Sequence, residues 1–357
     1  MIQVTKTYLP PLEEYIGYLE GIWERSYLTN DGPLSRQLED GLKALVGSKH
    51  LSFCTNGTIV LQIALKILDI KGEVLTTPFS YVATTNFLLW ENCEPIFVDI
   101  DPKTYCIDPT LIEAAITERT TAIVATHVYG NACDVIEIER IAKKHNLFVI
   151  YDGAHAFGSN LNGKSLLSFG DITTCSFHAT KLFHTIEGGM LVTNRDDWEH
   201  KMKFMRAFGH KGDEYYFMGI NGKNSEFHAA MGLCNLPRVP ELIAARKTIC
   251  DLYDATLNLD KLTRPELVTG LDYNYAYYAV VFESEAKLLE VRDYLIEHGI
   301  TPRRYFYPSL NTLHFLKNQQ SCPVSEDIAS RVACLPLHAA LPLEDVVRIA
   351  KLANERL

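Results

Sequence analysis

Short apolar runs alternate with longer amphipathic stretches through the first two thirds of the chain. Runs of four to six residues are too short for buried helices and are typical of buried strands. The stretches between them repeat apolar residues at helical spacing. We expect strands at 51–54, 73–76, 95–98, 121–126, 147–151, 173–177 and 190–193, and helices at 59–68, 82–90, 109–116 (capped by Asp108) and 135–145.

Strands and helices that alternate in this way indicate an α/β protein with a mixed, mostly parallel sheet covered on both faces. In such sheets the ligand lies beyond the carboxyl ends of the strands. The pattern changes after residue 238, where we expect a helix at 239–257, a strand at 277–282 and helices at 286–298 and 343–357. We therefore predict a large domain at 1–238, which includes the N-terminal segment, and a smaller α+β domain at 239–357. Because no Gly/Ser-rich linker separates them, we expect them to pack closely.

The composition is that of an ordinary globular protein. Hydrophobic residues make up 47% and charged residues 22% of the 357 positions. The formal net charge of −10, without a basic stripe, argues against nucleic-acid binding but not against a small phosphate-bearing ligand. We find no signal peptide and no apolar run of the roughly 18 residues that a membrane helix needs. The nine cysteines lack metal-site spacing, so we expect reduced, buried thiols, no metal and a cytoplasmic protein.

Two chemically strong candidates follow predicted strands. Asp152 ends the strand at 147–151, and Lys181 follows the strand at 173–177 in the segment Ser176-Phe177-His178-Ala179-Thr180-Lys181. A desolvated lysine has a lowered pKa and forms an imine with a carbonyl compound. A carboxylate can keep a ring nitrogen of a bound cofactor protonated. Taken singly, the aspartate could equally be a helix cap and the lysine a solvated loop residue.

Further candidates lie at the same predicted edge. Gly57 and Thr58 stand between a strand and a helix, where free N–H groups attract an anion; the alternative is an ordinary turn capped by a threonine. Tyr81 follows the strand at 73–76 and either stacks on a planar ligand or packs in the core. His155 either exchanges a hydrogen bond with a ring hydroxyl or is structural.

A mixed basic and aromatic cluster occurs in the second domain, in the run Arg303-Arg304-Tyr305-Phe306-Tyr307-Pro308. An arginine can bind a diphosphate through two parallel hydrogen bonds, and an aromatic ring can stack on a nucleobase. A plain surface loop remains the alternative, since both residue types are common at protein surfaces.

The order of these features along the chain is more specific than any one of them. The segments 55–58, 77–84, 95–101, 128–131, 152–158, 176–181 with Glu187-Gly188-Gly189, and 221–232 follow one another as in a known family. Over nearly its whole length the chain resembles the nucleotide-sugar aminotransferases of the DegT/DnrJ/EryC1/StrS family. The Ser-Phe-His-Ala-Thr-Lys segment with its Glu-Gly-Gly is the most specific part of this resemblance.

The resemblance implies a pyridoxal 5′-phosphate-dependent transferase of fold type I, similar to aspartate aminotransferase, which passes through a pyridoxamine 5′-phosphate form and works as a homodimer. Lys181 matches the lysine that holds the cofactor as a Schiff base, and Asp152 matches the carboxylate that pairs with its ring nitrogen. Tyr81 matches the stacking aromatic residue, and His155 stands where many members carry Gln near the ring oxygen. The phosphate ligands match Gly57, Thr58 and Ser176, together with Asn221, which the partner subunit would donate.

The resemblance also implies a reaction. Some relatives carry His in place of the lysine and are sugar dehydratases, so Lys181 favours transamination. The lysine segment is similar to that of members that aminate C4, not to the Phe-Tyr-Pro-x-Lys-Asn-Leu-Gly of C3 members. The segments at 303–308 and 334–338 are similar to the same group, and we expect substrate contacts from Arg303, Arg304, Tyr305 and His338.

The implied reaction moves an amino group from L-glutamate to the 4-keto group of a nucleotide-linked 4-keto-6-deoxyhexose. The expected substrate is dTDP-4-keto-6-deoxyglucose, and the product is dTDP-4-amino-4,6-dideoxyglucose. Two alternatives stay open: a 3-aminotransferase acting on a 3-keto nucleotide sugar, and a sensor that binds the cofactor without turnover.

Overall fold

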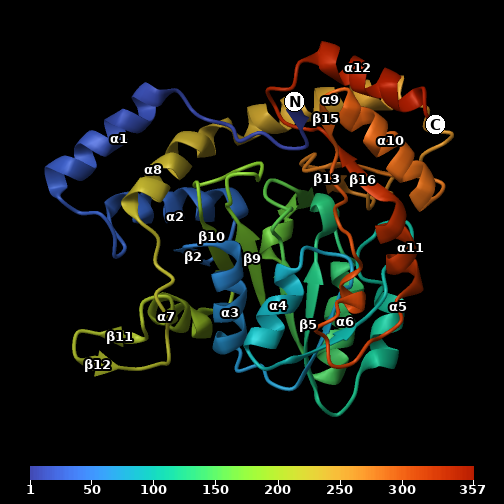
Figure 1. The fold of residues 1–357 in the computed structure, drawn as a ribbon. Helices are drawn as coiled ribbons and strands as arrows, with labels where there is room; N and C mark the ends of the chain where they lie inside the picture. The colour runs from blue at the N-terminus through green and yellow to red at the C-terminus, as the bar shows by residue number, and fades with distance from the viewer.

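The centre of the molecule is a seven-stranded sheet in the order β2-β10-β9-β6-β5-β3-β4 (Figure 1). The computed structural model describes residues 1–357. Strand β10 is antiparallel to both neighbours, and every other pairing in the sheet is parallel, as expected. The strands are β2 (His50–Cys54), β3 (Glu73–Thr76), β4 (Glu94–Phe97), β5 (Thr120–Thr126), β6 (Phe148–Asp152), β9 (Ile172–Ser176) and β10 (Gly189–Thr193). All seven predicted strands are confirmed, with ends that shift by at most one residue.

Helices cover both faces of this sheet. Successive side chains of a strand point to opposite faces, so Val74 enters the core on one face and Leu75 the core on the other. Trp198 and Met202 pack into the first core, and Leu38 and Ile138 into the second. The helices of this part are α2 (Pro33–Val46), α3 (Gly57–Ile67), α4 (Ala83–Trp90), α5 (Pro109–Ile112), α6 (Val135–His145), α7 (Asp196–Met205) and α8 (Glu226–Asn235).

The second part has a core of its own, which contains 20 buried residues. A two-stranded antiparallel ladder, β14 (Tyr278–Val281) with β16 (Val332–Leu335), is covered by helices at one end of the molecule (Figure 1). These helices are α9 (Val239–Thr256), α10 (Glu285–Glu297), α11 (Pro323–Arg331) and α12 (Leu343–Asn354). The predicted strand and helices of this part are confirmed, although the last helix ends three residues before the C-terminus.

The two parts share short strands. At the N-terminus, β1 (Ile2–Gln3) pairs in parallel with β15 (Ile300–Thr301), so the first residues lie against the second part. A small three-stranded sheet joins β7 (Asn160–Leu161), β8 (Lys164–Ser165) and β13 (Leu271–Asp272). The division at residue 238 stays a prediction.

One expected helix needs correction, and several helices were not predicted. Asp108 does accept the Thr110 N–H at 2.9 Å, but the helix it caps covers only Pro109–Ile112 and continues as a single 3₁₀ turn, Glu113–Ala115. The backbone of Ile116 is extended, and the chain then enters β5. The helix α1 (Leu12–Arg25) was not predicted, and neither were α2, α7, α8 and α11.

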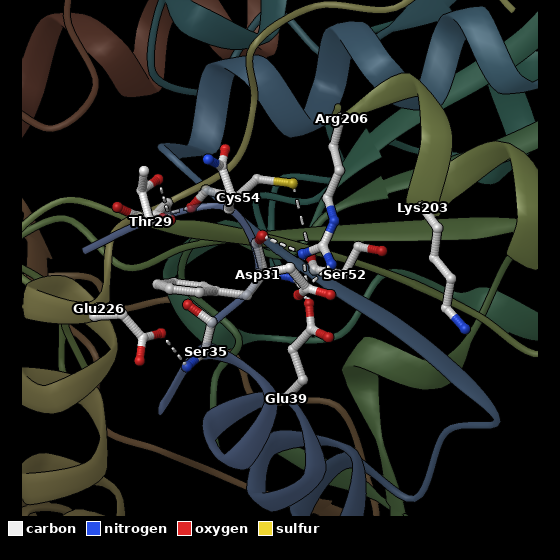
Figure 2. Close-up of polar contacts among 12 residues, drawn as sticks. Thr29, Asp31, Ser35, Glu39, Ser52, Cys54, Lys203, Arg206 and Glu226 are labelled. Carbon is white, nitrogen blue, oxygen red and sulfur yellow. Dashed lines mark hydrogen bonds and ion pairs between the residues drawn. The ribbon is translucent and has the colours of Figure 1, made fainter. Parts of the chain in front are cut away.

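A buried ion-pair network joins the sheet edge to the segment after α7 (Figure 2). Arg206 donates to Glu39 Oε1 at 2.5 Å, to the Phe53 carbonyl at 2.7 Å and to Asp31 Oδ1 at 2.9 Å. A buried guanidinium is stable only when its charge and its N–H groups are paired, as they are here. The network therefore fixes the start of the 206–224 segment against β2.

The other end of the same segment is fixed by an asparagine. Asn224 Nδ2 donates to the Cys54 carbonyl at 3.1 Å and to the Glu187 carbonyl at 2.9 Å. Between these two anchors the chain forms the exposed hairpin of β11 (His210–Lys211) and β12 (Glu214–Tyr215), which projects from the body of the molecule (Figure 1). Asn221 lies on the returning arm of this segment.

No helix combines the length and the apolar character needed to span a bilayer. All nine cysteines are buried, and none is paired with another.

Candidate active site

A cavity of about 310 Å³ opens at the carboxyl edge of the sheet. Parallel strands β2, β3, β6 and β9 end there, and the second part supplies the opposite wall. Most of the predicted site residues line this one cavity: Gly57, Thr58, Tyr81, Asp152, His155, Ser176, Lys181, Arg303 and Tyr305. The expectation that the ligand site lies beyond the strand ends is therefore consistent with the structure.

Asp152 is the last residue of β6 and is 6% exposed. Its Oδ1 accepts the Ala154 N–H at 3.0 Å, and its Oδ2 accepts the Thr84 hydroxyl at 2.8 Å. Burial raises the pKa of this carboxyl, whereas the two hydrogen bonds and nearby Lys181 oppose that rise. No helix begins at Asp152, so the helix-cap alternative is wrong. The carboxylate is available to a ligand with a positive nitrogen.

Lys181 lies on the loop after β9, and its Nζ has neither a hydrogen bond nor an ion pair with another residue. The loop is held by the Lys181 N–H, which donates to the His178 carbonyl at 2.8 Å, and by the Phe177 N–H, which donates to the Gly188 carbonyl at 2.8 Å. Burial lowers the lysine's pKa, and Asp152 partly offsets this effect. A lowered pKa increases the fraction of neutral amine, which is the form that attacks a carbonyl carbon.

The turn from β2 into α3 approaches the end of β9 closely. A Cβ at Gly57 would lie 2.8 Å from Ser176 Cβ and 3.0 Å from its Oγ, so this approach requires glycine. Asn56 caps the helix, because its Oδ1 accepts the N–H groups of Thr58 at 3.0 Å and Ile59 at 2.9 Å. The threonine-cap alternative is therefore wrong. Since the Thr58 N–H is already bonded, Thr58 would contact an anion through its exposed hydroxyl.

His155 is 4% exposed and forms part of an aromatic wall. Its ring stacks on Phe306, with centroids 5.4 Å apart and planes at 12°, and meets Tyr277 edge-on. Burial, followed by the charge of Lys181, holds the pKa of this imidazole well below its usual range, so the ring is neutral. Its Nδ1 has no hydrogen-bond partner, and a buried polar atom of this kind is normally satisfied by a ligand or water.

The mouth of the cavity is more exposed than its floor. Tyr81 is 59% exposed and lies on one side. Arg303 enters from the second part, with its guanidinium over the Tyr305 ring at 5.1 Å and without an ion-pair partner. The cavity therefore carries an unpaired cation beside an aromatic ring, an arrangement suited to an anionic ligand with a planar group.

Three predicted residues do not line this cavity. Arg304 donates to Glu285 Oε1 at 2.7 Å and to the Ser330 carbonyl at 2.6 Å, both within the second part. His338 is buried in the second part, and burial lowers its pKa to about 4. Asn221 is exposed, and its Oδ1 accepts the Lys223 ammonium at 2.7 Å. Their functional roles stay predictions.

Some lining residues were not among the predicted site residues. Ser80 lines the cavity, and Thr84 bonds directly to Asp152. Both lie in the 77–84 segment that carries the family resemblance, and their spacing of four residues at the start of a helix was the available signal. Other lining residues that were missed are His178, Glu187, Tyr277 and Phe306.

The model of the DegT/DnrJ/EryC1/StrS aminotransferase family matches residues 12–353. The chain belongs to this family. A dTDP-4-amino-4,6-dideoxy-D-glucose transaminase of Shigella dysenteriae is 42% identical over 357 aligned positions, which cover 95% of each chain. A transaminase of the same name from Escherichia coli is 37% identical over 98% of this chain and 97% of its own. The crystal structure of DesI in the presence of its TDP-sugar product has a TM-score of 0.93 at 30% identity and covers 99% of this chain and 92% of that one.

These matches confirm the predicted family, the type I fold and the assignment as an aminotransferase. The family implies pyridoxal 5′-phosphate, and the cavity has a donor set that fits it. The residues that line it include a buried aspartate, a neutral histidine with one unpartnered ring nitrogen and a lysine with an unpaired amine. Gly57, Thr58 and Ser176 line the cavity together beside the start of α3, and a helix N-terminus is a favourable place for a phosphate.

Proposed function

We propose that this aminotransferase uses pyridoxal 5′-phosphate to move the amino group of L-glutamate to the 4-keto group of dTDP-4-keto-6-deoxyglucose, giving dTDP-4-amino-4,6-dideoxyglucose. The observation that carries the proposal is the unpaired Lys181 amine in one cavity with the buried Asp152 carboxylate. The names of the Shigella and Escherichia relatives support the choice of sugar and of C4.

The cofactor would be held by residues already in place. When bound, pyridoxal phosphate supplies a carbonyl that forms a Schiff base and a ring that withdraws electrons from the adjacent carbon. Asp152 keeps the ring nitrogen protonated through an ion pair, and neutral His155 offers its free nitrogen to the ring hydroxyl. Tyr81 covers the ring. The phosphate is bound by Gly57, Thr58 and Ser176.

Lys181 has two tasks that follow from its lowered pKa. Its neutral amine would anchor the cofactor and, once displaced by glutamate, would take a proton from the substrate Cα and pass it to the cofactor's carbonyl carbon. In the second half of the reaction, Lys181 would move a proton in the opposite sense, from that carbon to C4 of the sugar. A base whose pKa lies nearer to neutrality performs both steps, because neither protonation state is strongly favoured.

The nucleotide part of the sugar substrate would lie at the mouth. Arg303 would bind the diphosphate through charge-assisted hydrogen bonds, and Tyr305 would stack on the base or the sugar. Arg304 and His338 lie outside this cavity, and their predicted contacts with the substrate stay predictions.

We further propose that the protein is a cytoplasmic homodimer in which Asn221 reaches the partner's cofactor phosphate. The support is its exposed position on the anchored 206–224 segment, outside the cavity of its own chain. Unpaired buried thiols are typical of a reducing compartment. We do not expect nucleic acid or membrane as partners.

The deciding experiment incubates purified protein with pyridoxal phosphate, L-glutamate and a panel of nucleotide keto sugars, and determines the product by NMR. We expect a new C–N bond at C4 of the dTDP sugar and one equivalent of 2-oxoglutarate. Nitrogen at C3 would overturn the regiochemistry. A protein that binds the cofactor but releases no 2-oxoglutarate at saturation would be the sensor, against which the paired presence of Lys181 and Asp152 argues.

A further inference from the structure

Three buried hydroxyl groups form a continuous hydrogen-bond chain behind Asp152. Thr126 Oγ1 donates to Ser80 Oγ at 3.2 Å, Ser80 Oγ lies 2.8 Å from Thr84 Oγ1, and Thr84 Oγ1 donates to Asp152 Oδ2 at 2.8 Å. Thr84 and Thr126 are fully buried, and Ser80 is 2% exposed. They come from the ends of neighbouring strands, since Thr126 ends β5 opposite Asp152, and Ser80 and Thr84 follow β3.

The direction of this chain follows from counting hydrogens. A hydroxyl has one hydrogen, and an ionised carboxylate can only accept. Because Thr84 donates to Asp152, Ser80 must donate to Thr84, and Thr126 to Ser80. In this order every hydroxyl hydrogen has an acceptor.

Protonation of Asp152 on Oδ2 would disturb this order, whereas protonation on Oδ1 would leave the order intact but weaken the Thr84 hydrogen bond, which is stronger to a charged acceptor. If its carboxyl hydrogen pointed to Thr84, the chain would have to reverse, and the Thr126 hydrogen would have no acceptor among the contacts in the structure. An unsatisfied buried donor costs about 1–3 kcal/mol. The hydroxyl chain therefore favours the ionised form of the carboxyl, which burial by itself disfavours.

We propose that Thr84, with Ser80 and Thr126 behind it, is a positioning residue that keeps the Asp152 carboxylate ionised and aimed at the cofactor's ring nitrogen. The consequence for the cofactor rests on the proposed function, whereas the effect on the carboxyl is a property of the chain alone. Lys181, Cys175 and His155 are the titratable groups that face Asp152 from the other elements, and none of them is changed in the variants below.

The test compares Thr84→Val with Thr85→Val. Thr85 is the next residue of α4, is also fully buried and has a hydroxyl without a hydrogen-bond partner, so it is a matched control for loss of a threonine oxygen. The pKa of Asp152 is measured in the cofactor-free protein by carbon-13 NMR of labelled aspartate, with Asp152→Asn to assign the signal. We expect Thr84→Val to raise this pKa by about one unit and Thr85→Val to leave it unchanged.

A second readout is the dissociation constant of pyridoxal phosphate, measured by absorbance titration. We expect about a tenfold increase for Thr84→Val, a smaller one for Ser80→Ala and the smallest for Thr126→Val, because the effect weakens with distance along the chain. Thr84→Ser keeps the donor and should behave like the wild type, which separates loss of the hydrogen bond from loss of folding.

Equal pKa values in Thr84→Val and Thr85→Val would overturn the inference and leave the proposed function intact. A wild-type protein that does not bind pyridoxal phosphate would overturn the proposed function, whereas the NMR comparison would still decide the role of the hydroxyl chain. Failure of Thr84→Ser to restore the wild-type pKa would also count against the inference, since it would point to packing and not to hydrogen bonding.

Discussion

The inner wall and the mouth of the cavity differ in burial and in how their polar side chains are paired. The inner wall, by which we mean Ser80 and Asp152 together with Thr84 and Thr126 behind them, is buried, and each of these polar side chains is hydrogen-bonded to the next. The mouth (Tyr81, Arg303 and Tyr305) is more open, and Arg303 has no ion-pair partner.

An aminotransferase must hold its cofactor in a fixed orientation and must also select its substrate, and we expect these two tasks to fall to different regions. A buried polar group is tolerated only when it is bonded, so the inner wall has few acceptable sequences and holds a fixed carboxylate. Side chains on loops at a mouth can change with little cost to folding. We therefore assign the chemistry common to the family to the inner wall, and the choice of sugar and nucleotide to the mouth.

Loss of Lys181 should have the largest effect, because the reaction needs this residue whichever region binds the substrate or orients the cofactor. We expect Lys181→Ala to lower turnover by at least about 10²–10⁴-fold, because it removes both the covalent anchor and the proton-transfer group. Borohydride reduction followed by mass spectrometry should fix the cofactor to the wild type and not to the variant. The surface variant Lys71→Ala is the control. An imine that is still reducible onto the Lys181→Ala protein would contradict the assignment.

Asp152→Asn tests the inner wall. We expect turnover to fall about 10²–10³-fold, since the electrostatic partner of the ring nitrogen is lost.

The same variant tests how the Asp152 carboxyl affects the stability of the cofactor-free protein as pH changes. Burial raises the pKa of Asp152 in the folded state, so the folded protein binds more protons than the unfolded chain between the ordinary carboxyl pKa and the raised one.

The contribution of this carboxyl to stability is therefore fully present below the ordinary pKa and is lost as pH rises through the raised one. Differential scanning calorimetry of cofactor-free proteins over this range should show the Tm of Asp152→Asn gaining on that of the wild type as pH rises. Parallel pH profiles would contradict the pKa shift.

The mouth is tested by two adjacent arginines. Arg303→Ala should raise KM for the nucleotide sugar about 10–100-fold with little change in kcat, because a charge-assisted contact to phosphate is lost. Arg304→Ala is the matched control, since its guanidinium is bound to Glu285 and Ser330 and Arg304 does not line the cavity. Steady-state kinetics decide between them. An equal rise in KM for both would mean that Arg304 also reaches the substrate, as its sequence position suggested.

The smallest expected effect is that of Asn221→Ala, which tests whether the site is completed across a dimer. Loss of one neutral hydrogen bond to phosphate should weaken cofactor binding by about two- to tenfold. Mixed dimers with Lys181→Ala subunits provide the sharper readout, because such a dimer retains one site with both residues intact. If mixing the two variants restored no tight cofactor site, Asn221 would not act across subunits.

Local patterns in the sequence were enough to predict the seven strands of the central sheet. Most of the seven strands of this sheet are short, largely apolar runs, and residues that follow parallel strands gather at one edge. For this reason Gly57, Tyr81, Asp152 and Lys181 were predicted together, and the structure places them around one cavity. Helices α1, α2, α7, α8 and α11 were not predicted from the same patterns.

The sequence by itself determined the fold class, the family and the residues at the strand ends, since these depend on local composition and on the order of motifs. The tertiary structure decided which of two adjacent arginines enters the cavity, that Asn56 and not a threonine caps α3, and that three hydroxyls end on Asp152. The physical reason is that such contacts depend on strand order. Ser80, Thr126 and Asp152 become neighbours only because β5 lies between β3 and β6, an arrangement that no local pattern specifies.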